Sequence, residues 1–232
     1  MAAESQVAQR VALIAGSTGV TGAALLQLLL RNHEFSRIHA VTRRPLPLAH
    51  PRLANRILKF DELAARLAGV RCTDAFCCLG AAQGPRAPEA ELRQVDVNLV
   101  VAFARTAQTA GATRMVVVSA ARADRNAPQA FQRCKGEMEA ALRELRFQSL
   151  EILQPGPVLG MRPQGTARDA IRMAFLPLLN PLLRGSMGGS RAILGTDLAA
   201  AMLGVARTQR RGVYCVGGES LRDLAVAGRR PS

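Results

Sequence analysis

The hydrophobic positions of this chain fall into two alternating patterns. Short continuous apolar runs are typical of strands buried on both faces of a parallel sheet. Longer stretches with helical spacing lie between these runs. This alternation predicts a doubly wound α/β fold, in which helices cover both faces of one parallel sheet. We expect strands at residues 11–15, 37–42, 57–60, 74–79, 114–119, 150–153 and 212–216, and helices at 23–30, 62–68, 89–110, 131–146 and 197–207.

Three glycines, Gly16, Gly19 and Gly22, separate the first strand from the first helix. In a dinucleotide-binding loop, the first glycine permits a tight turn and the second lets backbone N–H groups approach a pyrophosphate. The third lets the helix pack close to the strand. The phosphates then lie at the helix N-terminus, where unpaired N–H groups favour an anion. The pattern predicts nucleotide binding in a Rossmann-like fold, rather than a plain strand–helix turn.

The residues after the second and third strands bear on the adenosine end of a cofactor. Arg43 and Arg44 stand where an acidic residue would favour NAD, and a basic residue there accommodates the 2′-phosphate of NADP. Guanidinium groups suit phosphate, so we expect NADP(H) to be preferred, with NAD(H) as the alternative. The alternative is that Arg43 and Arg44 are two ordinary surface arginines. Asp61 has two open roles, which are contact with an adenine amino group and capping of helix 62–68.

The net charge of +14 changes this picture little. Only Lys59 and Lys135 are lysines, so arginine carries the basic excess. A nucleic-acid surface more often clusters its basic residues on one element and adds aromatic side chains. Here the arginines are scattered and the aromatic residues are few, which makes nucleic acid an unlikely partner.

The five cysteines make an odd number without C-x-x-C spacing, which argues against a disulfide framework and a structural zinc site. We expect no metal, and we expect Cys77 and Cys78 to be core residues. The sequence shows neither a signal pattern nor an apolar run long enough to span a bilayer. These features predict a cytoplasmic protein.

The length predicts a single NAD(P)-binding domain over residues 1–232. Its cofactor-binding core would cover about 8–160, a substrate or lid region 161–195, and a return to the core 196–220. Within the lid region, the apolar segment 171–183 is broken by two prolines. We expect it to cover a substrate, while a partner surface and a membrane-surface patch are the alternatives.

Three further expectations concern helix ends and assembly. Thr196 is a candidate N-cap of the helix at 197–207, and residues 228–232 should form a loose end. The apolar helix 92–107 offers a surface for a homodimer, although the sequence does not determine the oligomeric state.

Several motifs together resemble the short-chain dehydrogenase/reductase superfamily over about residues 8–220. The run Lys135-Gly136-Glu137-x-Glu139 is similar to the atypical branch that includes the Tat-interacting-protein-like NAD(P)-binding oxidoreductases and their bacterial relatives. The motifs are Gly16-x-x-Gly19-x-x-Gly22, the strand end Cys78-Leu79-Gly80, Ser119, Phe131-x-x-x-Lys135 and Pro155-Gly156-Pro157-Val158.

The resemblance implies a role for each matching position. Lys135 would hydrogen-bond the nicotinamide ribose, Val158 would offer its backbone to the carboxamide, and Ser119 would orient a substrate carbonyl oxygen. The catalytic candidates are Ser119 and Lys135, with Phe131 in place of a tyrosine. The cofactor-binding candidates are Gly16, Thr18, Gly19, Val20, Gly22, Arg43, Arg44, Asp61, Leu79, Gly80, Lys135 and Val158.

Phe131 is the departure from the family pattern. The family's tyrosine hydroxyl gives a proton to the reduced substrate, which a phenyl ring cannot do. General acid catalysis is typically worth about 10²–10⁴ in rate. Tyr214 is the only tyrosine, and four residues on stands Gly218 instead of a lysine. We expect cofactor binding to survive, since a compact ammonium at Lys135 suits a ribose diol better than a guanidinium.

Three hypotheses follow. The first is an NADP(H)-dependent oxidoreductase acting on a small carbonyl or alcohol, whose proton comes from water, Ser119 or the substrate. The second is a catalytically inactive NADP(H)-binding sensor or scaffold protein, whose segment 171–183 meets a protein partner. The third and weakest is an anion- or nucleic-acid-binding protein that uses the arginine excess.

Overall fold

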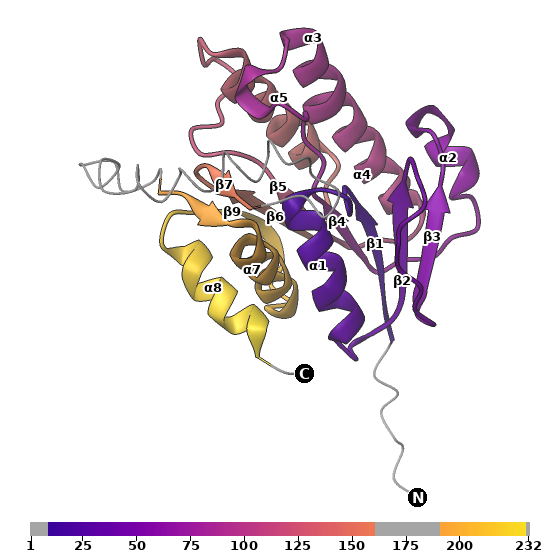
Figure 1. Cartoon of the computed structure of the whole chain (residues 1–232). Helices are drawn as coiled ribbons and strands as arrows, with labels where there is room; N and C mark the ends of the chain where they lie inside the picture. The colour runs from indigo at the N-terminus through magenta and orange to yellow at the C-terminus, as the bar shows by residue number, and fades with distance from the viewer. Residues whose placement is uncertain (1–8, 161–190, 231–232) are drawn as a thin grey trace, which may run out of the picture.

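A computed structural model describes residues 9–160 and 191–230, which form a seven-stranded parallel sheet with helices on both faces (Figure 1). The strand order is β3-β2-β1-β4-β5-β6-β9. The predicted doubly wound, Rossmann-like fold is therefore confirmed. The strands are β1 Arg10–Ala15, β2 Phe35–Thr42, β3 Leu53–Ile57, β4 Asp74–Cys77, β5 Arg114–Val118, β6 Ser149–Gln154 and β9 Gly212–Gly217, and a separate pair is β7 Val158–Leu159 and β8 Ile193–Leu194.

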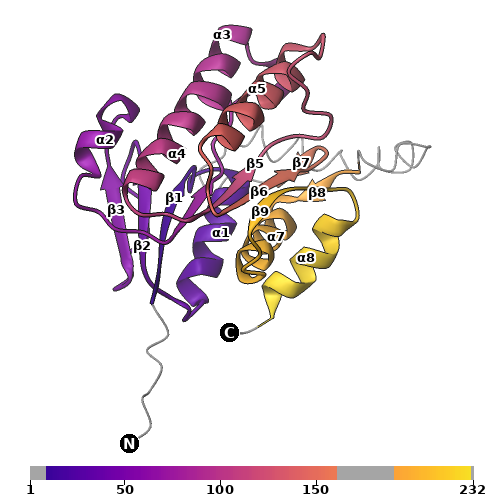
Figure 2. The same cartoon turned by 180° about the vertical axis from the view of Figure 1, so that it is seen from behind.

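The helices lie in two layers around this sheet. Figures 1 and 2 show α1, α7 and α8 over one face and α2, α4 and α5 over the other. The helical elements are α1 Val20–Arg31, α2 Leu63–Arg66, α3 Glu89–Leu92, α4 Val100–Thr109, α5 Ala130–Glu144, α7 Gly195–Arg207 and α8 Ser220–Arg229, with the π-helical η3 Arg93–Leu99 between α3 and α4 and the 3-10 turns η1 Phe60–Glu62 and η2 Gly84–Arg86. None of these described helices is long and apolar enough to cross a membrane.

The first strand shows why a continuous apolar run predicts a central strand. Ala12 and Ile14 pack in the core beneath α1, α7 and α8, whereas Leu13 and Ala15 pack in the core on the opposite face. All four residues have no exposed surface. Successive side chains of a strand point to opposite faces, so both faces of β1 must be apolar.

The third strand and the C-terminal end differ from the sequence-based predictions. β3 ends at Ile57, where the predicted strand began, because β3 is a half-buried edge strand and lacks the continuous apolar run of the central strands. The predicted loose end is wrong at residues 228 and 229, which complete α8. Gly228 is buried where α8 packs against α7, and any Cβ at this position would overlap the carbonyl of Ala200 in α7. The predictions for segment 171–183 lie outside the described residues.

Thr196 is not the N-cap of α7. The helix begins at Gly195, and Leu194 occupies the N-cap position without a side-chain hydrogen bond. A Cβ at Gly195 would overlap Cγ1 of Val20 at the start of α1. The close approach of these two helix starts, rather than a capping hydroxyl, determines where α7 begins.

A buried charge cluster joins the amino ends of three neighbouring strands. Asp74 of β4 is fully buried. Its Oδ1 accepts hydrogen bonds from Arg10 Nη2 at 2.6 Å and Arg114 Nη1 at 2.8 Å. Its Oδ2 accepts hydrogen bonds from Arg10 Nε at 3.1 Å and Thr73 Oγ1 at 2.7 Å. Burial alone would raise the pKa of this carboxyl. The hydrogen bonds and charge of Arg10, together with the hydrogen bonds from Thr73 and Arg114, outweigh burial, so the pKa is lowered.

We expect Asp74→Asn to lower the free energy of unfolding by about 3 kcal/mol at pH 7, because both guanidinium groups lose a buried partner. A lowered folded-state pKa contributes stability above the ordinary Asp pKa of about 3.9, and that stability disappears as pH falls through the folded value. Urea titrations should therefore show the loss at pH 7 and a shrinking difference below about pH 4.

The matched control is Asp223→Asn, which changes an exposed carboxyl in α8. It should cost less than about 0.5 kcal/mol, as is usual for a surface substitution. An equal loss in both variants, or a loss in Asp74→Asn that does not vary with pH, would contradict the role assigned to the Asp74 cluster.

Candidate functional site

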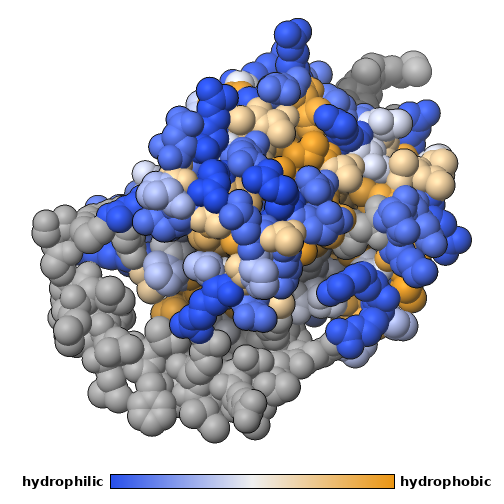
Figure 3. All heavy atoms as spheres, turned by 90° about the horizontal axis from the view of Figure 1, so that it is seen from above, coloured by the Kyte–Doolittle hydropathy of each residue, from blue (hydrophilic) through white to orange (hydrophobic). Residues whose placement is uncertain are grey.

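The candidate site lies at the carboxyl ends of β1 and β4, where the order of the strands reverses. β1 and β4 are neighbours in the sheet, and the chain runs outward from them to β2 and β3 on one side and to β5 and β6 on the other. Open α/β sheets bind ligands in the crevice outside such a point. Seen from this edge, apolar side chains gather between hydrophilic ones (Figure 3).

Gly16 brings the end of β1 against the end of β4. Its φ of +83° lies in the left-handed region that favours glycine. A Cβ at this position would lie 2.5 Å from the carbonyl oxygen of Cys78. A side chain here would therefore separate the two strands at the edge where the ligand crevice opens.

Gly22 and Gly19 complete this close approach. A Cβ at Gly22 would overlap the carbonyl oxygen of Gly16, and one at Gly19 would lie 3.3 Å from the same atom. The N–H of Gly19 donates a hydrogen bond to that carbonyl at 3.0 Å. The backbone geometry thus explains why Gly16 and Gly22 lack side chains, while the approach of a pyrophosphate at Gly19 stays a prediction.

The start of α1 offers polar groups that could meet an anion. Its N-cap is Gly19, which has no side chain to accept a hydrogen bond from the first turn of the helix. Ser17 Oγ is buried in the loop without a hydrogen-bond partner among the described residues. Unpaired groups at a helix N-terminus suit phosphate. Together with the glycine cradle, they fit the pyrophosphate of a dinucleotide, and Ser17 is a residue that the sequence analysis missed.

Val20 connects this loop to the separate two-stranded pair β7–β8. A Cβ at either Gly160 or Gly195 would overlap Val20 Cγ1. These glycines lie directly after β7 and β8, which pair with each other. Val158 of β7 pairs with Ile193 and is 39% exposed. The structure therefore brings Val158 to the same edge as the glycine loop, while its contact with a carboxamide stays a prediction.

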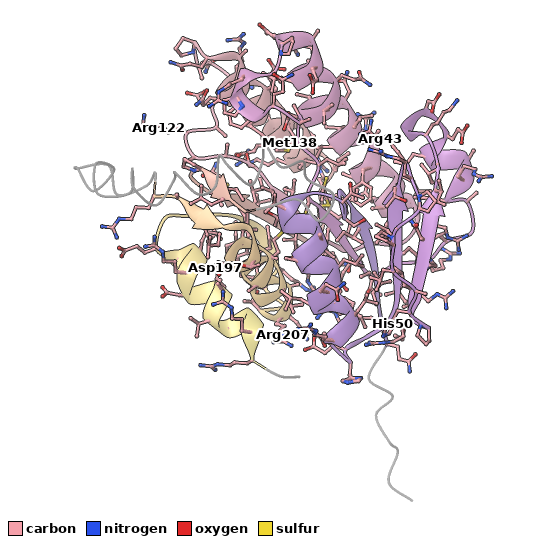
Figure 4. All side chains as sticks on the ribbon, in the orientation of Figure 1. Arg43, His50, Arg122, Met138, Asp197 and Arg207 are labelled. Atoms are coloured by element: carbon pink, nitrogen blue, oxygen red, sulfur yellow. The ribbon has the colours of Figure 1, made fainter. Side chains whose placement is uncertain are left out.

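The residues predicted to meet the adenosine are all exposed. Arg43 follows the carboxyl end of β2 (Figure 4), and Arg44 comes next. Neither side chain hydrogen-bonds or pairs with another residue in the described ranges. Asp61 lies in η1, and Glu62, not Asp61, is the N-cap of α2 and makes no cap hydrogen bond. The capping alternative for Asp61 is therefore wrong. Thr18 is exposed at the tip of the glycine loop.

Lys135 forms a buried ion pair with Asp96. The Lys135 Nζ lies 2.5 Å from Asp96 Oδ1, and the two side chains are 4% and 1% exposed. The contact is an ion pair, and Asp96 Oδ1 accepts no hydrogen bond from the described residues. Asp96 Oδ2 accepts a hydrogen bond from the N–H of Ala81 at 3.1 Å, just after Leu79 and Gly80. Asp96 therefore joins η3 and the loop after β4 to α5.

Asp96 is the second residue that the sequence analysis missed. It occupies a π-helical segment, η3, within the helix predicted at 89–110. π-helical turns are frequent at functional sites. The available signal was a carboxylate between Val95 and Val97 in an otherwise apolar pattern. A buried carboxylate requires a partner of opposite charge, and Lys135 was the candidate for that partner.

Phe131 lies one helical turn before Lys135 on α5. Its ring centroid is 5.9 Å from Lys135 Nζ, within the range of a cation–π contact. The ring packs beside a small apolar cluster formed by Ala81, Ala87, Leu92 and Cys134. The ring therefore shields one side of the ammonium and carries no hydroxyl for proton transfer.

Ser119 is buried at the end of β5, with its hydroxyl directed toward α5. Its Oγ donates a hydrogen bond to Glu139 Oε1 at 2.5 Å. The same oxygen accepts from Gln154 Nε2 at 2.9 Å, and Arg143 Nη2 lies 3.2 Å from Oε2. The proton of Ser119 is committed to Glu139, so a role on a substrate carbonyl stays a prediction.

The loop that follows β5 presses on α5 beside Lys135. A Cβ at Gly136 would overlap the backbone of Asp124 and Arg125. The N–H of Asp124 donates a hydrogen bond to the carbonyl of Gln132 at 3.1 Å. Arg122 in this loop has a φ of +61°, an uncommon conformation for a residue with a side chain. Gly136 is thus needed for packing inside the Lys135-Gly136-Glu137 motif.

The cysteines at the end of β4 are core residues, as predicted. Cys77 is fully buried, and Cys78 packs partly buried against the other core. Burial raises the pKa of the Cys77 thiol to about 12. A thiol with so high a pKa is a poor nucleophile. The described residues contain no group of three or more side chains that could hold a metal ion.

The fold and the glycine cradle define a nucleotide-binding protein of the Rossmann type, and comparison with known families narrows this class. The NAD(P)H-binding family matches residues 16–154, more than half of the chain. The chain belongs to this family.

Three curated relatives cover most of the chain. Protein HTATIP2 of Rattus norvegicus is 28% identical over 166 residues, which are 70% of this chain and 68% of the relative. Mitochondrial protein FMP52 of Lodderomyces elongisporus is 29% identical over 199 residues, 76% of this chain and 82% of the relative. Mitochondrial FMP52 of Kluyveromyces lactis is 30% identical over 157 residues, 65% and 68%.

Solved structures share the fold at low identity. MoeE5 in complex with UDP-glucose and NAD has a TM-score of 0.65 and 18% identity, covering 93% of this chain and 80% of its own. A short-chain dehydrogenase family protein from Francisella tularensis subsp. tularensis SCHU S4 has a TM-score of 0.66 and 14% identity, covering 91% and 98%. With the curated relatives, these matches confirm the resemblance to atypical short-chain dehydrogenases/reductases and support a nicotinamide dinucleotide as the cofactor.

The comparisons also correct one prediction. We expected a cytoplasmic protein from the absence of a signal pattern. The FMP52 relatives are named as mitochondrial proteins, which contradicts that expectation. Amino-acid composition and the lack of a secretory signal pattern do not distinguish the cytoplasm from a mitochondrial compartment that also keeps thiols reduced.

We expect Asp96→Asn and Lys135→Met each to lower the free energy of unfolding by about 3 kcal/mol, because each leaves a buried charge without its partner. The double variant should cost clearly less than the sum of the two single variants, since it removes both charges. Urea denaturation of the four proteins completes the cycle. Additive losses would show that the two side chains do not interact.

Proposed function

We propose that this protein is an NADP(H)-dependent oxidoreductase of the atypical short-chain class, acting on a small carbonyl or alcohol without a tyrosine proton donor. The observation that carries the proposal is the buried Lys135–Asp96 pair beside the Phe131 ring. Burying an ammonium and a carboxylate costs several kcal/mol each before they attract one another. Two apolar residues at these positions would stabilise the fold as well as the ion pair does. A functional role therefore explains why the two charged residues are present.

The cofactor would be held along the carboxyl edge of the sheet. The cradle formed by Gly16, Gly19 and Gly22 supports contact with the pyrophosphate, together with Ser17 Oγ. Arg43 and Arg44 have guanidinium groups that are free of partners among the described residues and suit a 2′-phosphate, and Asp61 would contact the adenine amino group. Lys135 would bond the nicotinamide ribose, and Leu79 and Gly80 would line the crevice opposite it.

When bound, the nicotinamide supplies or accepts the hydride. Asp96 would keep the Lys135 ammonium charged and aimed at the ribose. The Phe131 ring would exclude water from one side of that ammonium. Because residue 131 has no hydroxyl, the substrate oxygen would receive its proton from water or from Ser119 after that hydroxyl leaves Glu139.

We expect the double variant Arg43→Gln/Arg44→Gln to weaken NADPH binding by about tenfold to a hundredfold and to leave NADH binding nearly unchanged. A charge-assisted hydrogen bond to phosphate contributes about 1.5–3 kcal/mol, and only NADPH carries the 2′-phosphate. Titration followed by nicotinamide fluorescence measures both affinities.

The matched control is Arg105→Gln, which removes an exposed charge from α4 on another part of the surface. It should leave both affinities unchanged. Tighter binding of NADH than NADPH by the parent protein, or equal losses for both cofactors in the double variant, would contradict NADP preference.

We expect Phe131→Tyr to raise the rate of NADPH-dependent carbonyl reduction by about 10²–10⁴, since it restores a proton donor one turn from Lys135. Phe131→Leu, which changes packing without adding a hydroxyl, should produce no gain. NADPH oxidation over a panel of small aldehydes and ketones measures the rates, and fluorescence titration checks that all three proteins bind cofactor alike.

The second candidate is an NADP(H)-binding sensor or scaffold without turnover. It is favoured by the commitment of the Ser119 hydroxyl to Glu139 and by the lack of a hydroxyl at Phe131. The same experiment separates the two candidates. A parent protein that binds NADPH and shows no reduction, while Phe131→Tyr gains it, would establish the sensor alternative and overturn the oxidoreductase.

A further inference from the structure

A second cavity lies away from the cofactor crevice, on the face of the sheet that α2 covers. It measures about 400 Å³ and opens to solvent. Its floor is formed by the sheet, at Val11 near the start of β1 and at Arg37 and His39 of β2. Its rim is formed by Arg56 of β3, by Arg66 at the end of α2 and by residues 68–71 of the following loop.

The lining of this cavity is strongly basic. Four arginines contribute to it, from three elements and one loop, and no acidic residue lines it. Arg56, Arg66 and Arg71 are exposed, and their side chains make no hydrogen bond or ion pair with any described residue. Elsewhere, by contrast, arginines such as Arg10, Arg114 and Arg210 are paired with carboxylates. The lining arginines remain available for an external anion.

His39 adds a second, independent observation. The residue is part of the cavity lining although it is only 8% exposed, and its buried Nδ1 has no hydrogen-bond partner within residues 9–160 and 191–230. A buried polar atom without a partner costs free energy, and most such atoms in native proteins are satisfied. An anion bound in the cavity would lie against the imidazole and change its electrostatic surroundings.

We propose that this cavity is a binding site for a small multiply charged anion, such as a metabolite that carries a phosphate or diphosphate group. Guanidinium groups suit phosphate oxygens because they donate in a planar fork. The volume is within the range of small-molecule sites. A concave site of this size favours a small ligand over a nucleic-acid backbone, which needs an extended basic surface.

The state of His39 gives the site a measurable signature. Burial, followed by the charges of Arg56 and Arg37, lowers the pKa of its imidazole, so the ring is neutral at pH 7 in the free protein. Arg66 on α2 and Arg71 on the loop before β4 add positive charge from the other side. A bound anion would counter these charges, and we expect the pKa of His39 to rise on binding.

The test is an imidazole NMR titration with inorganic pyrophosphate at constant ionic strength. The chain has three histidines, so a His39→Gln variant assigns the His39 signal directly. The expected result is a saturable shift of that signal at submillimolar to millimolar pyrophosphate, and an upward movement of its pKa at saturation. His33 and His50 should respond only weakly.

Two variants and a control test the site. Arg56→Gln and Arg71→Gln should each weaken pyrophosphate binding by about tenfold, whereas Arg105→Gln should leave it unchanged. Circular dichroism checks that each variant is folded, which is expected because all three arginines are exposed.

Four outcomes would overturn the proposal. They are the absence of a saturable His39 response, an equal loss in Arg105→Gln, loss of the response on saturation with NADPH, and tighter binding of a short DNA duplex that all three variants weaken alike. The third would place pyrophosphate in the cofactor crevice, and the fourth would indicate binding through net charge alone. NADPH affinity is measured separately, so failure here leaves the proposed cofactor site untouched.

Discussion

The close backbone approach at Gly16 is the constraint on which the rest of the site depends. It brings the ends of β1 and β4 together and lets α1 start directly above them. Because no side chain intervenes at Gly16 or Gly22, the helix N-terminus can face the crevice at the reversal point of the sheet. The same crowding extends through Val20 to Gly160 and Gly195, so the entry to α7 is built on the same loop.

Charge is used differently at the two ends of the sheet. At the amino end, Asp74 links three strands, and its charge is balanced by Arg10 and Arg114, which both donate hydrogen bonds to it. At the carboxyl end, Asp96 balances the ammonium of Lys135 beside an apolar ring. The first cluster stabilises the sheet, and the second holds a cation where the cofactor ribose is expected.

The order and type of most elements could be predicted from sequence because central strands are apolar on both faces, as in β1. The glycine loop was equally accessible, since its spacing expresses a backbone requirement. Edge strand β3 was misplaced, because a half-buried edge strand lacks a continuous apolar run. Helix α8 was missed although Leu221, Leu224 and Ala225 follow helical spacing, because its place near the chain end suggested a loose terminus. The pairing of Asp96 with Lys135 was missed: the isolated carboxylate in an apolar pattern was a signal, but the two residues are far apart in sequence and meet only when η3 and α5 pack together.

The contact between Gly136 and the loop after β5 couples that loop to α5. The backbone of that loop packs against α5 beside the point where Lys135 pairs with Asp96. A side chain at residue 136 would push the loop and α5 apart and would shift Lys135 relative to Asp96. The position of this loop and the position of the Lys135 ammonium are therefore mechanically linked.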